Sequence, residues 1–292
     1  MEERKKAKNV IAIVILSVCL LGAAYFAAVT IIDIMARGQG QSFYDSLPAR
    51  SVSAPGTEQR DRQENADWFT ETGTAQPGSQ EAGQGNGQGS GEQEGVEPGE
   101  QTEEPAFMSA VDFEAIAVDC PDIIAWIFIE DTIIDYPVMQ GSDNQYYLNH
   151  LPNGASNKMG SIFMDCNNTP DFTDDVTYLY GHHMKSGEMF AILKSYGETS
   201  FYEAHRIINI YTPFADYEVE VFAGYIVSAS MERPPMRFGD ERAFNDYLNM
   251  ITSRSILKSD VGVSYGDRLV SLVTCNYNVD NGRLILVGKV RW

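Results

Sequence analysis

The pattern of apolar and polar positions divides the chain into three stretches. Val10–Ile32 is an uncharged, mostly apolar run of 23 residues. From Glu71 to Pro105 there are nine glycines, many Gln and Glu residues, and almost no large apolar side chain. Residues 106–292 carry short apolar runs separated by polar turn residues. This pattern predicts a membrane span, a linker and one folded domain.

The folded stretch is expected to be mainly β. Runs of β-branched and other apolar residues, bounded by turn-forming residues, indicate strands. Eight such runs occur: Ile123–Phe128, Ile133–Val138, Gly160–Met164, Thr177–Tyr180, Ile207–Thr212, Tyr217–Val227, Arg268–Thr274 and Leu284–Val290. Repeated strand–helix–strand units are absent, so a doubly wound parallel sheet is not expected. The prediction is an eight-stranded, closed or nearly closed β-barrel with a few peripheral helices.

One helix stands out by its periodicity. Within Asp240–Ile256, apolar side chains recur at i, i+3, i+4 and i+7, with acidic residues at the N-terminal end. Ala110–Ala117 and Met189–Tyr196 are predicted as two shorter helices. Residues 165–175 are polar and contain Pro170, so they are expected to form a loop.

The apolar run at the N-terminus is long enough to cross a bilayer, which takes about 20 helical residues. Four basic residues precede it: Arg4, Lys5, Lys6 and Lys8. Because such clusters stay inside the cell, residues 1–9 should be cytoplasmic, residues 10–32 a single-pass anchor in the cell membrane, and the rest extracellular. The alternative is a cleaved signal peptide, but Ile34-Met35-Ala36 is a poor cleavage site, which favours the retained anchor.

The segment after the anchor is expected to be a flexible, acidic, Gly-rich linker spanning residues 33–105, followed by the folded domain at residues 106–292. Residues 38–105 carry a net charge of −10 and lack the apolar side chains that a core needs. Like charges should keep such a segment extended and solvated. One local alternative is a helical turn at Ser42–Leu47, where Phe43, Tyr44 and Leu47 fall close together.

Charge and cysteine content exclude two classes of protein. The net charge is −20, of which −12 falls on residues 106–292, and nucleic-acid binding requires clustered basic residues instead. Four cysteines in 292 residues are too few for a disulfide scaffold. Cys120 and Cys166 are expected to be free, largely buried thiols, although an extracellular domain would permit them to pair.

Three residues at strand ends are candidates for chemistry. Cys275 follows an apolar strand, Arg283 begins the next strand, and His182 ends another. A cysteine nucleophile needs a nearby base or positive charge, and a guanidinium can stabilise an oxyanion. On spacing alone, these three residues are weak evidence for catalysis. The alternatives are a buried small thiol, a loop histidine of no catalytic role and an arginine in a surface ion pair.

The residues around these candidates resemble those of class B sortases of Gram-positive bacteria. Residues 274–275 (TC) and 283–289 (RLILVGK) resemble the two active-site strands, and residues 180–184 (YGHHM) with 187–190 (GEMF) resemble the histidine motif. Further matches are residues 122–127 (DIIAWI), 135–140 (DYPVMQ) and 160–165 (GSIFMD). The helix Asp240–Ile256 lies where the class carries an extra helix, and the resemblance covers about residues 107–292.

The resemblance implies an eight-stranded barrel and a transpeptidase that requires no cofactor or metal. Cys275 would attack an LPxTG- or NPxTN-like sorting signal of a surface protein, His182 would transfer the proton, and Arg283 would hold the substrate backbone and the oxyanion. An amine of a peptidoglycan precursor or of a pilin would then resolve the thioester. Tyr180 and Thr274 are candidate substrate contacts. The family motif favours His182 over His183 as the acid and base.

Two departures and two alternative functions remain. Many class B members have Ser-Thr-Cys at the nucleophile, whereas this chain has Val273-Thr274-Cys275, and the linker replaces compact N-terminal helices. The same scaffold would also suit a cysteine peptidase, in which water resolves the intermediate. A non-catalytic, membrane-tethered binding module is the other alternative, and the joint presence of three candidate residues in matching motifs argues against it.

Overall fold

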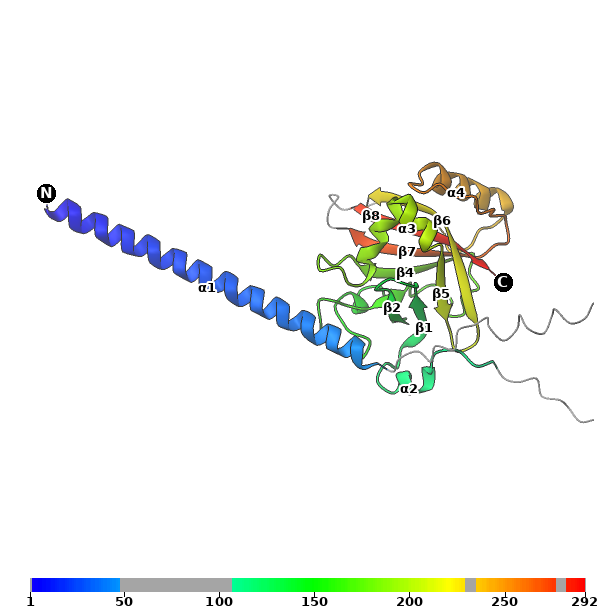
Figure 1. The fold of residues 1–292 in the computed structure, drawn as a ribbon, viewed down its shortest axis with the longest axis horizontal. Coiled ribbons are helices and arrows are strands. Elements are labelled where there is room, and N and C mark those ends of the chain that lie inside the picture. The colour runs from blue at the N-terminus through cyan, green and yellow to red at the C-terminus, as the bar shows by residue number, and fades with distance from the viewer. Residues whose placement is uncertain (1, 48–106, 229–234, 277–281, 292) are drawn as a thin grey trace, which may run out of the picture. The chain divides into compact units, whose positions relative to one another are not determined.

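The structure is a computed structural model that describes residues 2–47, 107–228, 235–276 and 282–291, without the side chains of residues 2–12 and 275–276. One compact unit comprises Met1–Ser51 and Met108–Trp292. The second unit, Val52–Phe107, lies outside the described residues except for Phe107, and so does most of the expected linker. Figure 1 shows the course of the chain.

The first unit contains a closed barrel of eight strands, as predicted. The strands follow one another around the barrel in the order β1-β2-β3-β4-β7-β8-β6-β5. Pairing is parallel between β2 and β3 and between β4 and β7, and antiparallel elsewhere. Their bounds are β1 Ile123–Phe128, β2 Asp135–Met139, β3 Ile162–Met164, β4 Val176–His182, β5 Ile207–Tyr211, β6 Asp216–Ser228, β7 Leu269–Asn276 and β8 Gly282–Arg291.

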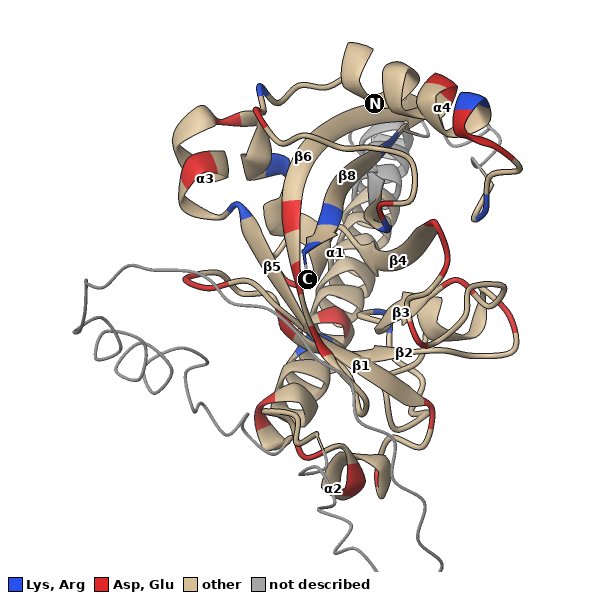
Figure 2. Cartoon of the chain, turned by 90° about the vertical axis from the view of Figure 1, so that its right-hand side faces the viewer, with Lys and Arg blue, Asp and Glu red and all other residues tan. Residues whose placement is uncertain are grey.

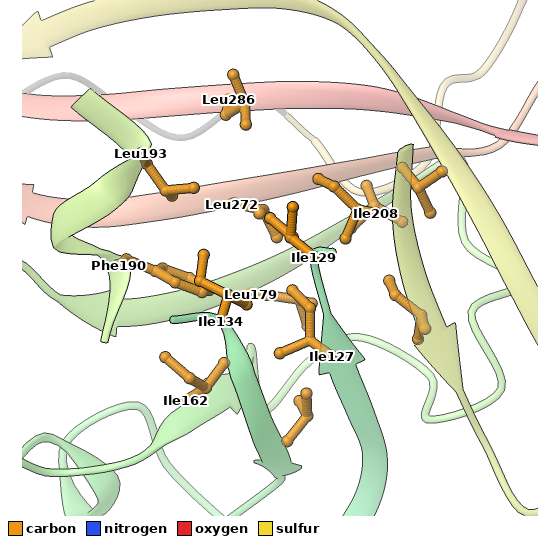
Figure 3. Packing of buried hydrophobic residues seen from close by; sticks show 14 of the residues in the cluster. Ile127, Ile129, Ile134, Ile162, Leu179, Phe190, Leu193, Ile208, Leu272 and Leu286 are labelled. Carbon is orange, nitrogen blue, oxygen red and sulfur yellow. The ribbon is translucent and has the colours of Figure 1, made fainter. Parts of the chain in front are cut away.

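Buried side chains form two clusters, because successive strand residues point to opposite faces. One cluster fills the barrel and includes Ile127, Leu179, Leu272 and Leu286 (Figure 3). The other, here called the outer cluster, includes Phe163, Tyr178, Tyr180, Val273, Ile285, Phe244 and Tyr247. Each fully buried apolar side chain of this size contributes about 1.5–3 kcal/mol to folding. The outer cluster lies on the outside of the barrel, so another element must shield it from solvent. A helix shields part of it.

That helix is α4, Glu241–Ser253, which the apolar periodicity predicted. Its buried residues Phe244, Tyr247 and Ile251 pack in the outer cluster, and the Asp240 side chain caps its first turn by accepting from the Ala243 N–H. The other helices are short: α2 Phe113–Ala117, α3 Thr199–Ala204, and the 3₁₀ segments η1 Tyr146–Leu148 and η2 Phe190–Gly197. Of these, α3 and η1 were not predicted, and η2 is 3₁₀ where an ordinary helix was expected.

The N-terminal helix α1 runs without a break from Glu2 to Ser46. It is long and apolar enough to cross a membrane. It also extends beyond the predicted end of the span at Ile32, so residues 33–46, expected as the start of the linker, are helical. The reason is packing: Phe43 and Tyr44 are partly buried against the barrel clusters, as is Leu47 just after the helix.

The loop between β3 and β4 is held by one buried carboxylate. The Asp174 side chain is 3% exposed, and its oxygens accept hydrogen bonds from Asn168 Nδ2, the Thr169 N–H, the Thr169 hydroxyl and Arg237 Nε. Burial by itself would raise the pKa of Asp174, but these hydrogen bonds outweigh it and hold the pKa below its usual value. Residues 165–175 form a loop as expected, and this loop is tightly anchored.

The charged and thiol side chains are distributed as follows. Among the described residues, both acidic and basic positions lie on the barrel (Figure 2), and several basic side chains form ion pairs, such as Arg206 with Asp260 and Lys289 with Asp267. Cys120 and Cys166 are free thiols, as predicted, with Cys120 buried and Cys166 half-buried.

Candidate active site

The strand register brings the three candidate residues together. In the parallel pair β4–β7, His182 is the direct partner of Cys275, and in the antiparallel pair β7–β8, Cys275 is the direct partner of Arg283. Neighbouring strands lie about 4.8 Å apart. The backbone of Cys275 therefore has His182 on one side and Arg283 on the other. The strands β4, β7 and β8 lie side by side in Figure 1.

Alternation along the strands assigns the three positions to one face. Tyr180, Val273 and Ile285 each lie two residues from a candidate residue, and all three belong to the outer cluster. Because every second residue shares a face, the candidate positions fall on the outer face of the sheet and not inside the barrel. This outer face carries α4 against part of its length, and the candidates lie at the ends of their strands.

His182 is held by a main-chain group. The ring is half-buried, and its Nε2 lies 2.6 Å from the carbonyl oxygen of Leu148. A carbonyl oxygen only accepts, so Nε2 carries the hydrogen and donates it. In the neutral ring, Nδ1 is then the nitrogen that can take up a proton. The Leu148 carbonyl thus sets both the orientation and the tautomer of His182.

The neighbouring His183 has a different environment. It is 8% exposed, and burial, together with the nearby Lys194, lowers the pKa of its imidazole. A ring whose charged form is disfavoured in this way is poorly suited to hold a proton for transfer. His183 is therefore a poor candidate for the acid and base.

The segment that supplies the Leu148 carbonyl is tightly built. Ser161 donates its N–H to Tyr147 O and its hydroxyl to His150 O. The Tyr147 hydroxyl donates to Asp122 Oδ2 at 2.6 Å. Gly160 has φ +62, and a Cβ there would lie 2.7 Å from the carbonyl oxygens of Tyr147 and Leu148. Sequence reasoning missed this segment, since a main-chain acceptor leaves no residue signature beyond a glycine.

The remaining candidates differ in placement. Arg283 is half-buried and pairs with Val227 of β6 on its other side. Tyr180 is 8% exposed, shares the outer face, and donates its hydroxyl to Asp165 Oδ2 at 2.9 Å. Thr274 is fully buried, occupies a position of the opposite parity, and its hydroxyl has no hydrogen-bond partner among the described residues. The structure brings Tyr180 to the site and does not bring Thr274 to that face.

The comparisons with known proteins show which family the chain belongs to. The family model for the sortase domain matches residues 127–291. The chain is 39% identical over 171 residues to sortase B of Listeria monocytogenes, covering 58% of this chain and 70% of that protein. It is 33% identical over 180 residues to sortase B of Staphylococcus aureus, covering 61% of this chain and 74% of that protein. The chain belongs to the sortase family, and these relatives are of its class B.

Solved structures give the same result. The Staphylococcus aureus sortase B–substrate complex matches with a TM-score of 0.59 and 33% identity, covering 61% of this chain and 84% of that one. Sortase B from Listeria monocytogenes matches with a TM-score of 0.54 and 40% identity, covering 57% and 94%. The fold is that of a class B sortase, and the activity is that of a cysteine transpeptidase for cell-wall sorting.

Proposed function

We propose that the transpeptidation is carried out by Cys275, His182 and Arg283, through an acyl-enzyme on Cys275. The observation that supports this most directly is the register, which makes Cys275 the direct strand partner of both His182 and Arg283. His182 and Cys275 are 93 positions apart in the chain, and the parallel pairing of β4 with β7 brings them side by side.

The first half-reaction cleaves a sorting signal. The Cys275 thiolate attacks the carbonyl carbon of the scissile peptide bond, and the carbonyl oxygen becomes an oxyanion next to the Arg283 guanidinium. His182 donates a proton from Nδ1 to the leaving amine as the carbon–nitrogen bond breaks. The nitrogen keeps the electron pair of the broken bond and receives the proton of the protonated His182. The products are therefore a neutral thioester on Cys275, a neutral His182 and the released C-terminal peptide with a neutral amine.

The second half-reaction forms the new bond. An incoming amine attacks the thioester carbonyl, His182 takes up the proton that this amine loses, and the Cys275 thiolate leaves. A thiolate is a good leaving group, which suits two successive acyl transfers. The proposed substrates are surface proteins with a C-terminal LPxTG- or NPxTN-like signal, and the proposed acceptor is an amine of a peptidoglycan precursor or of a pilin. Tyr180 is the proposed substrate contact on this face.

The proposed location follows from the N-terminal helix. Residues 10–32 would form a single-pass anchor in the cell membrane, with residues 1–9 in the cytoplasm and the catalytic domain of residues 106–292 outside. The candidate span and the preceding basic residues support this orientation. The extracellular location would place the enzyme where surface proteins and wall precursors meet.

Intact mass of the full chain in detergent tests the assignment. The chain is incubated with LPxTG- and NPxTN-type peptides, with and without triglycine as the amine. We expect an acyl adduct on the parent that the amine discharges, and none on Cys275→Ala. Cys166→Ala is the matched control, because Cys166 is a free, half-buried thiol outside the site. An adduct that persists on Cys275→Ala would contradict the assignment.

Two further variants separate the roles. His182→Ala should abolish turnover, and Arg283→Lys, which keeps the charge but loses the forked donors, should lower kcat by about 10²–10³-fold, as the loss of an oxyanion donor does. Release of free acid at the same rate whether or not triglycine is present would instead favour the peptidase alternative. Turnover by Arg283→Lys equal to that of the parent would exclude a role for the guanidinium.

A further inference from the structure

The end of α1 docks on one short segment of the barrel. Tyr44 donates its hydroxyl to Gly160 O at 2.8 Å, and Asn157 Nδ2 donates to Ala36 O at 2.7 Å. Lys158 Nζ lies 3.4 Å from Asp33 Oδ1. Asp33, Ala36 and Tyr44, which span about three turns of the helix, therefore contact residues 157–160. Residues 33–47 are here called the docking segment.

The docking segment fits closely because of a glycine and an aromatic pair. A Cβ at Gly40 would lie 3.1 Å from Met159 Sδ, so the absence of a side chain there allows the helix to approach. The Tyr44 ring meets Tyr136 edge-on, with centroids 5.2 Å apart. Burial raises the pKa of the Tyr44 hydroxyl, which therefore stays protonated and remains a donor at any ordinary pH.

The docked segment of the barrel is the one that holds the active-site histidine. Tyr44 bonds to the carbonyl of Gly160. Gly160 lies directly against the Leu148 carbonyl, since a Cβ on it would come within 2.7 Å of that oxygen. The same Leu148 oxygen accepts from His182 Nε2. A continuous series of close contacts thus leads from the helix that leaves the membrane to the imidazole.

We propose that Tyr44 is a positioning residue for the reaction and that its contact with Gly160 is part of the active-site framework. By holding Gly160, Tyr44 fixes the Leu148 carbonyl and with it the orientation and tautomer of His182. This inference rests on the proposed role of His182. It gives α1 a second task besides anchoring.

The spacing along α1 adds a consequence for the membrane. The apolar run ends at Ile32, and the next residue, Asp33, has its Oδ1 3.4 Å from Lys158 Nζ. From Asp33 to Tyr44 is about 16 Å of uninterrupted helix, at 1.5 Å per residue. An unbroken helix transmits orientation, whereas a flexible linker does not. The docking segment would therefore hold the active site at a set height above the bilayer.

The test compares full-length variants in detergent. Tyr44→Phe removes the hydroxyl and keeps the ring on Tyr136, and Tyr44→Ala removes both. Ser42→Ala, on the exposed side of the same helix, is the matched control. We expect kcat for peptide transfer to fall on the order of tenfold in both Tyr44 variants, because small misplacements of catalytic groups have effects of this size. KM should change by less than about twofold.

A second measurement reports on the imidazole itself. The ¹⁵N signals of His182, identified by their loss in His182→Ala, should move away from those of an Nε2–H tautomer in Tyr44→Phe. Thermal unfolding of each variant checks that kcat is compared between folded proteins. A Tyr44→Phe enzyme with the parent's kcat and unchanged His182 signals would overturn the inference, and so would an equal fall in kcat in Ser42→Ala.

The outcome for His182→Ala separates the two proposals. If His182→Ala turns over like the parent, the proposed role of His182 is wrong and the inference falls with it. If His182→Ala is inactive while Tyr44→Phe behaves as the parent, the proposed function stands and only the role of Tyr44 is wrong.

Discussion

Substituting Gly160 by alanine tests how His182, the proposed acid and base, is held. Gly160 has φ +62, and its added Cβ would lie 2.7 Å from the carbonyl oxygens of Tyr147 and Leu148. Ordinary contacts of a Cβ begin near 3.4 Å. These carbonyls would therefore have to retreat by several tenths of an ångström. The Leu148 oxygen would move relative to His182 Nε2, to which it is now bonded at 2.6 Å.

The expected loss of stability in Gly160→Ala has two parts. A left-handed alanine costs about 1–2 kcal/mol relative to glycine, and the overlap adds about 1 kcal/mol or more, as overpacking does. For a domain of this size each kcal/mol lowers Tm by about 2–4 °C, so a fall of about 4–12 °C is expected. The displaced carbonyl should lower kcat by about 10–100-fold, since a misplacement near 1 Å costs about 10²-fold.

The assay is peptide transfer by the full chain, with kcat expressed per folded molecule at a temperature well below both Tm values. The matched control is Gly266→Ala. Gly266 has φ +97 but nothing within 4 Å of an added Cβ, so it carries the backbone strain without the overlap. Gly266→Ala should lose stability and keep its kcat. A Gly160→Ala enzyme with normal kcat per folded molecule would refute the role of the Leu148 carbonyl.

Two further predictions concern stability. Asp174→Ala leaves its four hydrogen-bond donors without their acceptor and should cost on the order of 3 kcal/mol in denaturant unfolding. Because folding lowers the pKa of Asp174, the parent's stability advantage should be complete above the ordinary carboxyl pKa of about 4 and should decline as the pH falls from there through the lower folded-state pKa. An advantage that grows as the pH falls would contradict this. Gly181→Ala would place a Cβ 2.5 Å from Ile162 Cδ1 and should lower the free energy of unfolding by about 1–3 kcal/mol. An unchanged free energy of unfolding would contradict this and would show that the neighbouring side chains move to make room.

Elements with a strong local pattern could be predicted from the sequence. The strand Ile123–Phe128 has the same ends in the prediction and in the structure, and the amphipathic helix near Asp240 was located correctly. Elements with a weaker local pattern have different ends in the structure from those predicted. The second strand was expected from Ile133, but it begins at Asp135, because Ile134 O accepts from the Ile129 N–H in the turn between the strands.

The site was only partly accessible to sequence reasoning. Cys275, His182 and Arg283 could be nominated because their residue types suit acyl transfer and because their surroundings resemble a family motif. The roles of Tyr44, Gly160 and the Leu148 carbonyl could not be foreseen. Contacts between α1 and residues 157–160 span more than 110 residues of chain, and a carbonyl oxygen is present at every position.

The sequence by itself determined the local features of this protein: an apolar run that can span a membrane, eight strands, a covering helix and three candidate catalytic residues. Their type follows from periodicity and side-chain chemistry, which act over a few neighbouring residues. Only the tertiary structure decided that His182, Cys275 and Arg283 lie in register, that Thr274 is enclosed, and that α1 continues onto the barrel. These outcomes depend on strand pairing and burial between distant segments, which no local pattern specifies.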